Sequence, residues 1–383
     1  MIIDQPQLFI DIDDKKIVFV VVVYDKKLDF KILKTICINS AGVKKGKIID
    51  IDISSNALKK TIHQIEEEIN YIFNNATIVI NPSDINCLNV SGYKKLSGSQ
   101  VSEEDVSFIL NEVKELVSQN ETKYTLIHLF NSSFSIDSDN LENLPLGLFG
   151  EFYNQNMTFF LVDKNSLKNI KLVLNKCGVD IKRIILKPFV EGVNYISKNK
   201  LNTNFALVKL YEDRCSISIF KNKSFVFSEE FNFGTDLLIK DLSKLCSIKF
   251  EEAYTILREV DLLSLLLTND EEYLDKKYFK ISPFRKIKIK LVIDIINARL
   301  EELFEILYKK NINLNHLKSN NKNIYISIES EDIEKNIKKI LLDNISDDQE
   351  INFNESLDEK STNACVGAVE LSGKGWEKEA IPV

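Results

Sequence analysis

The stretch FALVKLYEDRCSISIF, residues 205–220, predicts two β-strands joined by a tight, charged corner. A mostly apolar run precedes the corner and the alternating run CSISIF follows it, which is the pattern of a half-buried hairpin. In a large α/β protein such a corner is a common position for a glycine-rich loop that binds phosphate. Here the corner runs from Lys209 to Arg214 and contains no glycine. Either the corner never bound phosphate, or a phosphate loop has decayed there.

The composition is that of a large, well-packed protein. The 383 residues are too many for one ordinary core, and 44% of them are hydrophobic. The net charge is -7, and positive and negative residues are mixed along the chain. Short runs of lysine such as Lys44-Lys45 are interpreted as solvated corners. This balance predicts no nucleic-acid partner, because phosphates require clustered cations. We find no signal peptide and no apolar run of about 20 residues, so we expect a cytoplasmic protein with at least two lobes.

Cysteine and histidine lie without the spacing of a metal site or a catalytic group. The six cysteines are scattered and mostly adjoin apolar residues, which favours reduced thiols in the core. The three histidines are far apart, and no Walker loop, HExxH or GxSxG motif is present. The sequence therefore predicts no metal site and no catalytic residue.

A strand meander followed by a helix occurs twice in the expected order of elements. QLFIDID, KIVFVVVVY and DFKILKTICI predict three strands near the N-terminus, and residues 54–73 predict a helix capped by Ser54 or Ser55. FALVKLY, CSISIF and SFVFSEEFNF form the second meander, again with helices after it. Residues 84–163 are interpreted as a small α+β insertion. Two similar α/β lobes are the architecture of the actin-like superfamily, so we expect an α/β, actin-like two-lobed fold.

Six local motifs, in the same order, resemble those of the bacterial cell-division family FtsA. They are SAGVKKGKIIDID, LNVSGYKKLSG with VSEEDV, LNKCGVDIKRIIL, FNFGTDLLIKDLSKLCSIKFEEA, VIDIINARLEELFEIL and STNACVGAVEL. The resemblance covers nearly the whole chain, and its insertion separates it from hexokinases and Hsp70-type chaperones. It implies the following parts: a first lobe at 1–83 and 164–200, an inserted FtsA-type (SHS2-like) subdomain at 84–163, a second lobe at 201–231 and 323–372, its helical subdomain at 232–322, and a tail at 373–383.

The family's phosphate loops are altered in this chain. In this chain the stretch that resembles the family's first phosphate loop reads DIDDKK, residues 11–16. Asp11 and Lys16 match the family pattern, but the two acids at positions 13 and 14 stand where phosphate would lie. In the second loop Lys209 replaces an aspartate, Arg214 replaces a threonine, and Tyr211, Glu212 and Asp213 replace glycines. Glycine allows backbone N–H groups to approach phosphate closely, and bulky or acidic side chains prevent that approach.

The two adenosine motifs are altered as well. In SIESEDIEK, which begins at Ser327, Ile328 and Glu329 replace glycines, and AYTIL at residues 253–257 lacks the Glu and Lys of the helix that grips ribose. We therefore expect weak binding of ATP or none, and no confident cofactor. The alternative is an active ATPase that binds ATP and Mg²⁺ with Lys15, Lys16, Lys209 and Arg214 as phosphate-binding cations.

The resemblance also implies partners. Arg299 and Glu302 match helix positions with which the family binds the C-terminal peptide of FtsZ, and the simpler interpretation is an intrahelical ion pair. Other divisome proteins, self-association into filaments and a location at the cytoplasmic face of the inner membrane at the division site follow from the same resemblance. The final residues GWEKEAIPV form no amphipathic helix, so we expect membrane contact to be indirect or to need a further segment. Besides an FtsA-like adaptor and an active ATPase, a third interpretation is that the chain is an actin-fold assembly platform of the PilM type.

Overall fold

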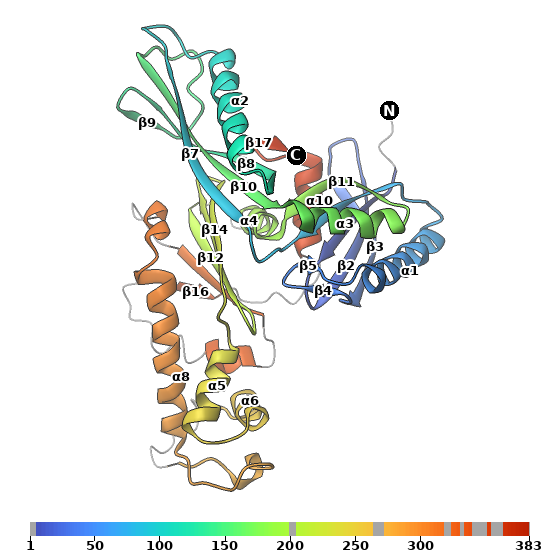
Figure 1. The fold of residues 1–383 in the computed structure, drawn as a ribbon, viewed down its shortest axis with the longest axis vertical. Coiled ribbons are helices and arrows are strands. Elements are labelled where there is room, and N and C mark those ends of the chain that lie inside the picture. The colour runs from blue at the N-terminus through green and yellow to red at the C-terminus, as the bar shows by residue number, and fades with distance from the viewer. Residues whose placement is uncertain are drawn as a thin grey trace. The chain divides into compact units, whose positions relative to one another are not determined.

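The computed structural model describes residues 5–198, 204–262, 272–317, 323–329, 333–338, 351–353 and 363–382. The described residues fall into two compact units. Unit 1 takes its residues from 1–203, 220–228 and 356–383, and unit 2 takes its residues from 204–219 and 229–355. Figure 1 shows the elements of both units along the chain.

Unit 1 contains a five-stranded sheet with the order β11-β6-β1-β2-β3. Its strands are β1 (Gln7–Ile12), β2 (Lys16–Tyr24), β3 (Phe30–Asn39), β6 (Asn75–Ile80) and β11 (Asp180–Leu186). Strands β1, β2 and β3 form an antiparallel meander, and β6 and β11 continue the sheet in parallel from β1. Nearly every residue of β2 is buried, which requires cover on both faces of the sheet. The predicted first meander is confirmed.

Four long helices belong to this part of unit 1: α1 (Ile51–Ile69), α3 (Lys164–Lys176), α4 (Lys187–Lys198) and α10 (Asn363–Lys374). Helix α1 packs on α3, and α10 packs on α4 and on strands β1, β2 and β6. The cap of α1 is Asp50, whose carboxylate accepts a hydrogen bond from the Ile53 N–H at 2.9 Å. The prediction of Ser54 or Ser55 as cap is therefore wrong, because both serines are buried inside the helix.

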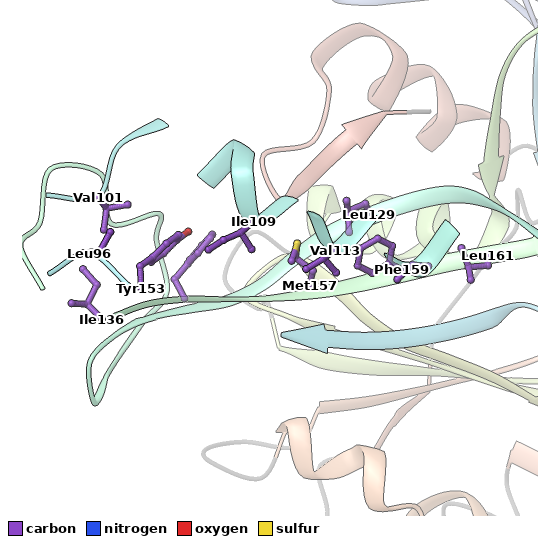
Figure 2. Close-up of a cluster of buried hydrophobic side chains, with 12 residues drawn as sticks. Leu96, Val101, Ile109, Val113, Leu129, Ile136, Tyr153, Met157, Phe159 and Leu161 are labelled. Atoms are coloured by element: carbon purple, nitrogen blue, oxygen red, sulfur yellow. The ribbon is translucent and has the colours of Figure 1, made fainter. Parts of the chain in front are cut away.

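Unit 1 also carries a second sheet with the order β17-β8-β10-β7. Strands β7 (Asn86–Lys95), β8 (Tyr124–Ile136) and β10 (Phe152–Asp163) are antiparallel neighbours, with the short β9 (Asp139–Leu141) beside β8. Helix α2 (Glu103–Asn120) has a capping box formed by Ser102 and Asp105. One face of α2 packs on this sheet through Ile109 and Val113, which meet Met157 and Phe159 in a continuous apolar cluster (Figure 2).

The chain between residues 204 and 353 forms a third sheet that repeats the order of the first. Its order is β14-β13-β12-β15-β16, built from β12 (Phe205–Leu210), β13 (Cys215–Lys221), β14 (Ser224–Phe231), β15 (Asn323–Ile328) and β16 (Ile351–Phe353). Strands β15 and β16 continue in parallel from β12, as β6 and β11 do from β1. In both sheets a meander is followed by two parallel strands in the same spatial order. The duplication expected from the sequence is therefore confirmed.

Among the described residues between β14 and β15, unit 2 has the α-helices α5 (Asp236–Leu245), α6 (Phe250–Glu259) and α8 (Ile289–Phe304). A π-helical turn, Glu305–Lys309, extends α8, and short 3₁₀ segments lie at Lys276–Tyr278 and Ile312–Leu317. Helix α5 packs on both α6 and α8.

Unit 1 also has two short paired strands, β4 (Val43–Lys44) and β5 (Lys47–Ile48).

The C-terminal residues differ from the prediction in two ways. Helix α10 belongs to unit 1, whereas residues up to 372 were expected in the second lobe; the Tyr24 hydroxyl donates to the Val369 carbonyl at 2.7 Å. Residues 373–383 were expected to be a tail, but Glu379–Pro382 forms β17 at the edge of β8. Glu379 is held there by buried partners that the local sequence does not show.

Those partners are His128 of β8 and Arg183 of β11. The Glu379 carboxylate lies 2.6 Å from His128 Nδ1 and 2.7 Å from Arg183 Nη2. His128 Nε2 accepts a hydrogen bond from the Leu186 N–H at 3.0 Å, so the neutral ring carries its proton on Nδ1. Because removing either partner would leave the buried Glu379 carboxylate poorly compensated, we expect this cluster to hold β17 in place.

Candidate functional site

The turn between β1 and β2 carries the first altered phosphate motif. Asp11, next to the last residue of β1, is only 2% exposed, and its Oδ2 lies 2.9 Å from Lys187 Nζ at the start of α4. Burial raises the pKa of Asp11 to about 6, although the Lys187 ammonium acts in the opposite direction. Lys187 also contacts the carboxylate of Asp13. One ammonium group from inside unit 1 thus contacts both carboxylates.

The rest of the same turn is also held by unit 1 itself. Asp14 Oδ1 accepts a hydrogen bond from the Gly46 N–H at 2.6 Å. Lys16 begins β2 with an exposed side chain, and its carbonyl accepts a hydrogen bond from the Asp13 N–H at 3.3 Å. The two acids that the sequence places where phosphate would lie therefore have protein partners.

The corner between β12 and β13, residues 209–214, is closed by its own side chains. Arg214 is 1% exposed, its guanidinium lies 4.7 Å from the centre of the Tyr211 ring, and its Nε lies 3.3 Å from Glu230 Oε2. Lys209 Nζ lies 5.9 Å from the same ring. The two cations therefore meet at one aromatic ring inside unit 2.

This corner also covers the start of α5. The carbonyl of Tyr211 accepts a hydrogen bond from the Thr235 N–H at 2.9 Å, and that of Glu212 accepts one from the Asp236 N–H at 2.8 Å. The packing is so close that a Cβ at Gly234 would lie 2.4 Å from the Tyr211 oxygen. N–H groups at a helix start are a common binding site for anions, and here the protein's own carbonyls take two of them.

The end of β15 carries the altered adenosine motif. Ser327 pairs in register with Lys209 of β12, and its hydroxyl donates to Glu329 Oε1 at 3.1 Å. Lys209 Nζ lies 3.3 Å from the same oxygen, and the Glu329 N–H donates to the Leu210 carbonyl at 2.8 Å. The structure thus brings Lys209 and Ser327 together, with Glu329 between them.

The fourth altered motif lies in α6. Ala253, Ile256 and Leu257 are buried, so the side of the helix they share faces the core of unit 2. Asn336 Nδ2 donates to the carbonyls of Leu257 and Val260 at 2.7 and 2.8 Å. The described positions of all four motifs are therefore occupied by contacts inside their own unit.

A separate groove lies between α5 and α8 and has a volume of about 530 Å³. Apolar side chains from both helices, Leu245, Ile295 and Ala298, line it together with charged side chains. Leu245 is 67% exposed, and Ala298 is exposed too. The charged lining residues are Asp241, Lys244, Asp294, Arg299 and Glu302.

Arg299 is the centre of charge in the groove. Its Nε donates to Asp241 Oδ2 at 2.5 Å, and its Nη1 donates to the Glu302 carboxylate one turn along α8. Hydrogen bonding to Asp241 raises the pKa of Arg299. The i, i+3 pair was anticipated from the sequence, whereas Asp241 was missed because it lies 58 residues away on another helix.

Comparison with protein-family models gives no match. Among curated proteins, the chain is 23% identical over 270 residues to the cell division protein FtsA of Bacillus subtilis, covering 70% of this chain and 61% of that protein. It is 21% identical over 269 residues to FtsA of Buchnera aphidicola from Schizaphis graminum, covering 70% and 64%. The predicted resemblance to FtsA is confirmed. The match spans less than two thirds of either relative.

The fold has its counterpart among solved structures. The PilM-PilN type IV pilus biogenesis complex contains a chain that superposes with a TM-score of 0.58 at 10% identity, covering 97% of this chain and 99% of that one. At this identity the likeness shows the fold alone, and it confirms the predicted actin-like fold. Within the part of the chain that the structure describes, no helix is both long and apolar enough to cross a membrane.

Proposed function

We propose that this FtsA-like chain is a cell-division adaptor that binds the C-terminal peptide of FtsZ in the groove between α5 and α8. The groove supports this proposal because it combines an apolar floor with a guanidinium group on the helix that carries the FtsA-like motif. Recruitment of other divisome proteins, self-association into filaments and a position at the cytoplasmic face of the membrane at the division site belong to the same proposal.

The charges of the groove define what the peptide must offer. Arg299 is already paired with two carboxylates, and Asp294 adds a third acid to the lining. An acidic residue of the peptide must therefore displace Asp241 or Glu302 from Arg299, whereas an apolar residue finds Leu245 and Ile295 directly. The expected complex is one in which apolar contact gives most of the affinity and Arg299 gives orientation.

We propose further that the adaptor works without nucleotide. In each unit, the residues that would face phosphate or adenosine are held by partners of the same unit, such as Lys187 for Asp11 and Glu329 for Lys209. Binding ATP would require those contacts to be broken and their charges to be desolvated anew, which costs free energy. A calorimetric titration with ATP and Mg²⁺ is expected to show no binding up to millimolar concentration, and micromolar affinity would refute this part of the proposal.

Fluorescence anisotropy with a labelled FtsZ C-terminal peptide and the full chain tests the adaptor itself. Arg299→Glu is expected to weaken binding about tenfold or more, because a charge-assisted hydrogen bond is lost and an acid is added. Lys310→Glu makes the same charge change on an exposed side chain that does not line the groove. Equal binding by the two variants would show that the peptide does not bind in the groove.

A further inference from the structure

Residues 276–290 of unit 2 form a strongly basic segment between α6 and α8. The run KKYFKISPFRKIKIK contains seven Lys or Arg residues and no acid, in a chain whose net charge is -7. The mixed charge of the whole chain hides this segment, because short runs of lysine are ordinarily solvated corners. In Figure 1 it lies in the loops at the end of unit 2, next to α6.

The segment is held in a defined conformation by a buried acid. Glu252, in the first turn of α6, is 4% exposed, and its Oε1 accepts hydrogen bonds from the Ile281 and Ser282 N–H groups at 2.7 and 2.9 Å. Burial acts to raise the pKa of Glu252, but the hydrogen bonds from Ser282, Ile281 and Lys249 outweigh it and lower the pKa to about 2. The carboxylate therefore stays ionised and keeps the segment anchored at every physiological pH.

Backbone pairing fixes the two ends of the same segment. The Leu274 N–H donates to the Ile287 carbonyl at 2.9 Å, and the Ile289 N–H donates to the Glu272 carbonyl at 2.9 Å. Between them the rings of Phe279 and Phe284 meet edge to face with centroids 5.2 Å apart. The basic side chains thus project from an ordered loop, so binding through them would not have to order the loop first.

Several of these cations are available to a partner. Lys280, Arg285 and Lys286 are exposed, and among the described residues none of the three forms an ion pair. Ile281 is 61% exposed and Phe284 is 45% exposed, so apolar side chains stand between the cations. Cations interspersed with exposed apolar side chains match the two layers of an anionic membrane surface, its headgroups and the edge of its acyl chains.

We propose that the segment 276–290 binds the surface of an anionic lipid bilayer, with its lysine and arginine side chains on the headgroups and Ile281 entering between them. Single-stranded nucleic acid fits less well, because its bases stack on free aromatic faces, whereas Phe284 is packed against Phe279 and Lys277 Nζ lies 5.0 Å from the centre of the Tyr278 ring. An acidic peptide needs a groove or a strand edge to orient it, and the groove described above lies on the faces of α5 and α8 instead.

This membrane site is independent of the FtsZ site. Its residues are not among those that line the groove, and its attraction to lipid is electrostatic rather than peptide-specific. Long-range attraction of this kind is screened by salt, so binding must weaken between low and high ionic strength. A chain that holds a peptide and a lipid surface at different places on unit 2 would keep the two together.

Co-sedimentation of the full chain with vesicles tests the proposal. Wild-type protein is expected to pellet with phosphatidylcholine vesicles containing phosphatidylglycerol, and much less with phosphatidylcholine alone. Replacing three cations, in the variant K280E/R285E/K286E, is expected to weaken binding to the anionic vesicles at least about fiftyfold, since each cation near such a surface contributes about fivefold. Ile281→Ser is expected to weaken binding about fivefold while leaving its salt dependence unchanged.

The variant K26E/K27E/K31E is the matched control, because it makes the same charge change on three exposed lysines of unit 1. It is expected to bind vesicles within about threefold of wild type, since its lysines lie outside the segment. Both triple variants must keep the wild-type circular dichroism and unfolding temperature. Equal binding of wild type to neutral and anionic vesicles, or equal loss in both triple variants, would overturn the proposal. So would binding of the segment to a poly-glutamate peptide or to single-stranded DNA without binding to vesicles.

Discussion

Lys209 Nζ lies 3.3 Å from Glu329 Oε1, with the Ser327 hydroxyl 3.1 Å from the same oxygen. In the FtsA-like pattern Lys209 stands where an aspartate is expected and Glu329 where a glycine is expected. Two positions that changed from the pattern therefore contact each other, and the cation at one neutralises the anion at the other. The alteration is a packed, charge-balanced structure, not a loop with random substitutions.

This pair makes a double-mutant cycle informative. Lys209→Glu brings two carboxylates together at side chains that are 14% and 22% exposed, so unfolding is expected to become easier by about 1–3 kcal/mol. The double variant K209E/E329K restores the opposite charges and should recover at least half of that loss in urea unfolding. Lys223→Glu is the control, because its partner Glu377 is 66% exposed and such pairs contribute little. An uncoupled double variant would contradict the pairing.

The cluster of His128, Glu379 and Arg183 predicts a dependence of stability on pH. Burial lowers the pKa of His128, so below about pH 6.5 the unfolded chain takes up a proton that the folded chain does not. Burial would raise the pKa of Glu379, but the hydrogen bond from His128, followed by the charge and hydrogen bond of Arg183, outweighs it and lowers that pKa. Stability should therefore fall as the pH drops below about 6.5, and again below about 4.5.

Thermal unfolding between pH 7.5 and 4 measures this effect. His128→Gln should remove the first decrease, whereas His63→Gln should keep it, because the His63 side chain is 55% exposed. Hydrogen exchange should report where the change occurs. At pH 5 the Asn131 amide, which donates to the Lys378 carbonyl directly before β17, should exchange faster than amides in the centre of the sheet. A pH-independent unfolding temperature in the wild type would contradict the assignment.

Removing one contact inside the groove is expected to strengthen peptide binding instead of weakening it. Asp241→Ala removes the carboxylate that lies 2.5 Å from Arg299 Nε and leaves the guanidinium free for an acidic residue of a peptide. Affinity for an acidic FtsZ C-terminal peptide is expected to rise about three- to tenfold. Glu305→Ala removes an acid from the turn after α8, outside the groove, and should leave the affinity unchanged. Weaker binding by Asp241→Ala would mean that the peptide needs Arg299 in its present orientation.

The sequence predicted those features that depend on local pattern. Strands β2 and β12 could be predicted because each is a short, continuous apolar run, and α8 could be predicted because its buried residues recur with the period of a helix. Strand β17 was missed because it is only four residues long and its Glu379 meets its partner, His128, across 251 residues of chain. The contribution of Asp241 to the groove and of Glu252 to the basic segment was missed for the same reason, since each acts on residues of another element.

The contact between α10 and α4 depends on the absence of a side chain at Gly367. A Cβ there would lie 2.7 Å from Val190 Cγ1, 2.7 Å from Asn194 Oδ1 and 2.8 Å from the Val190 carbonyl oxygen. Gly367→Ala should favour the helix intrinsically, yet we expect it to destabilise unit 1 by about 1–3 kcal/mol, because α10 must move away from α4. Urea unfolding measures the difference. Lys374→Ala on the exposed end of the same helix should cost less than about 0.5 kcal/mol. A more stable Gly367→Ala would show that the two helices are not packed at this point.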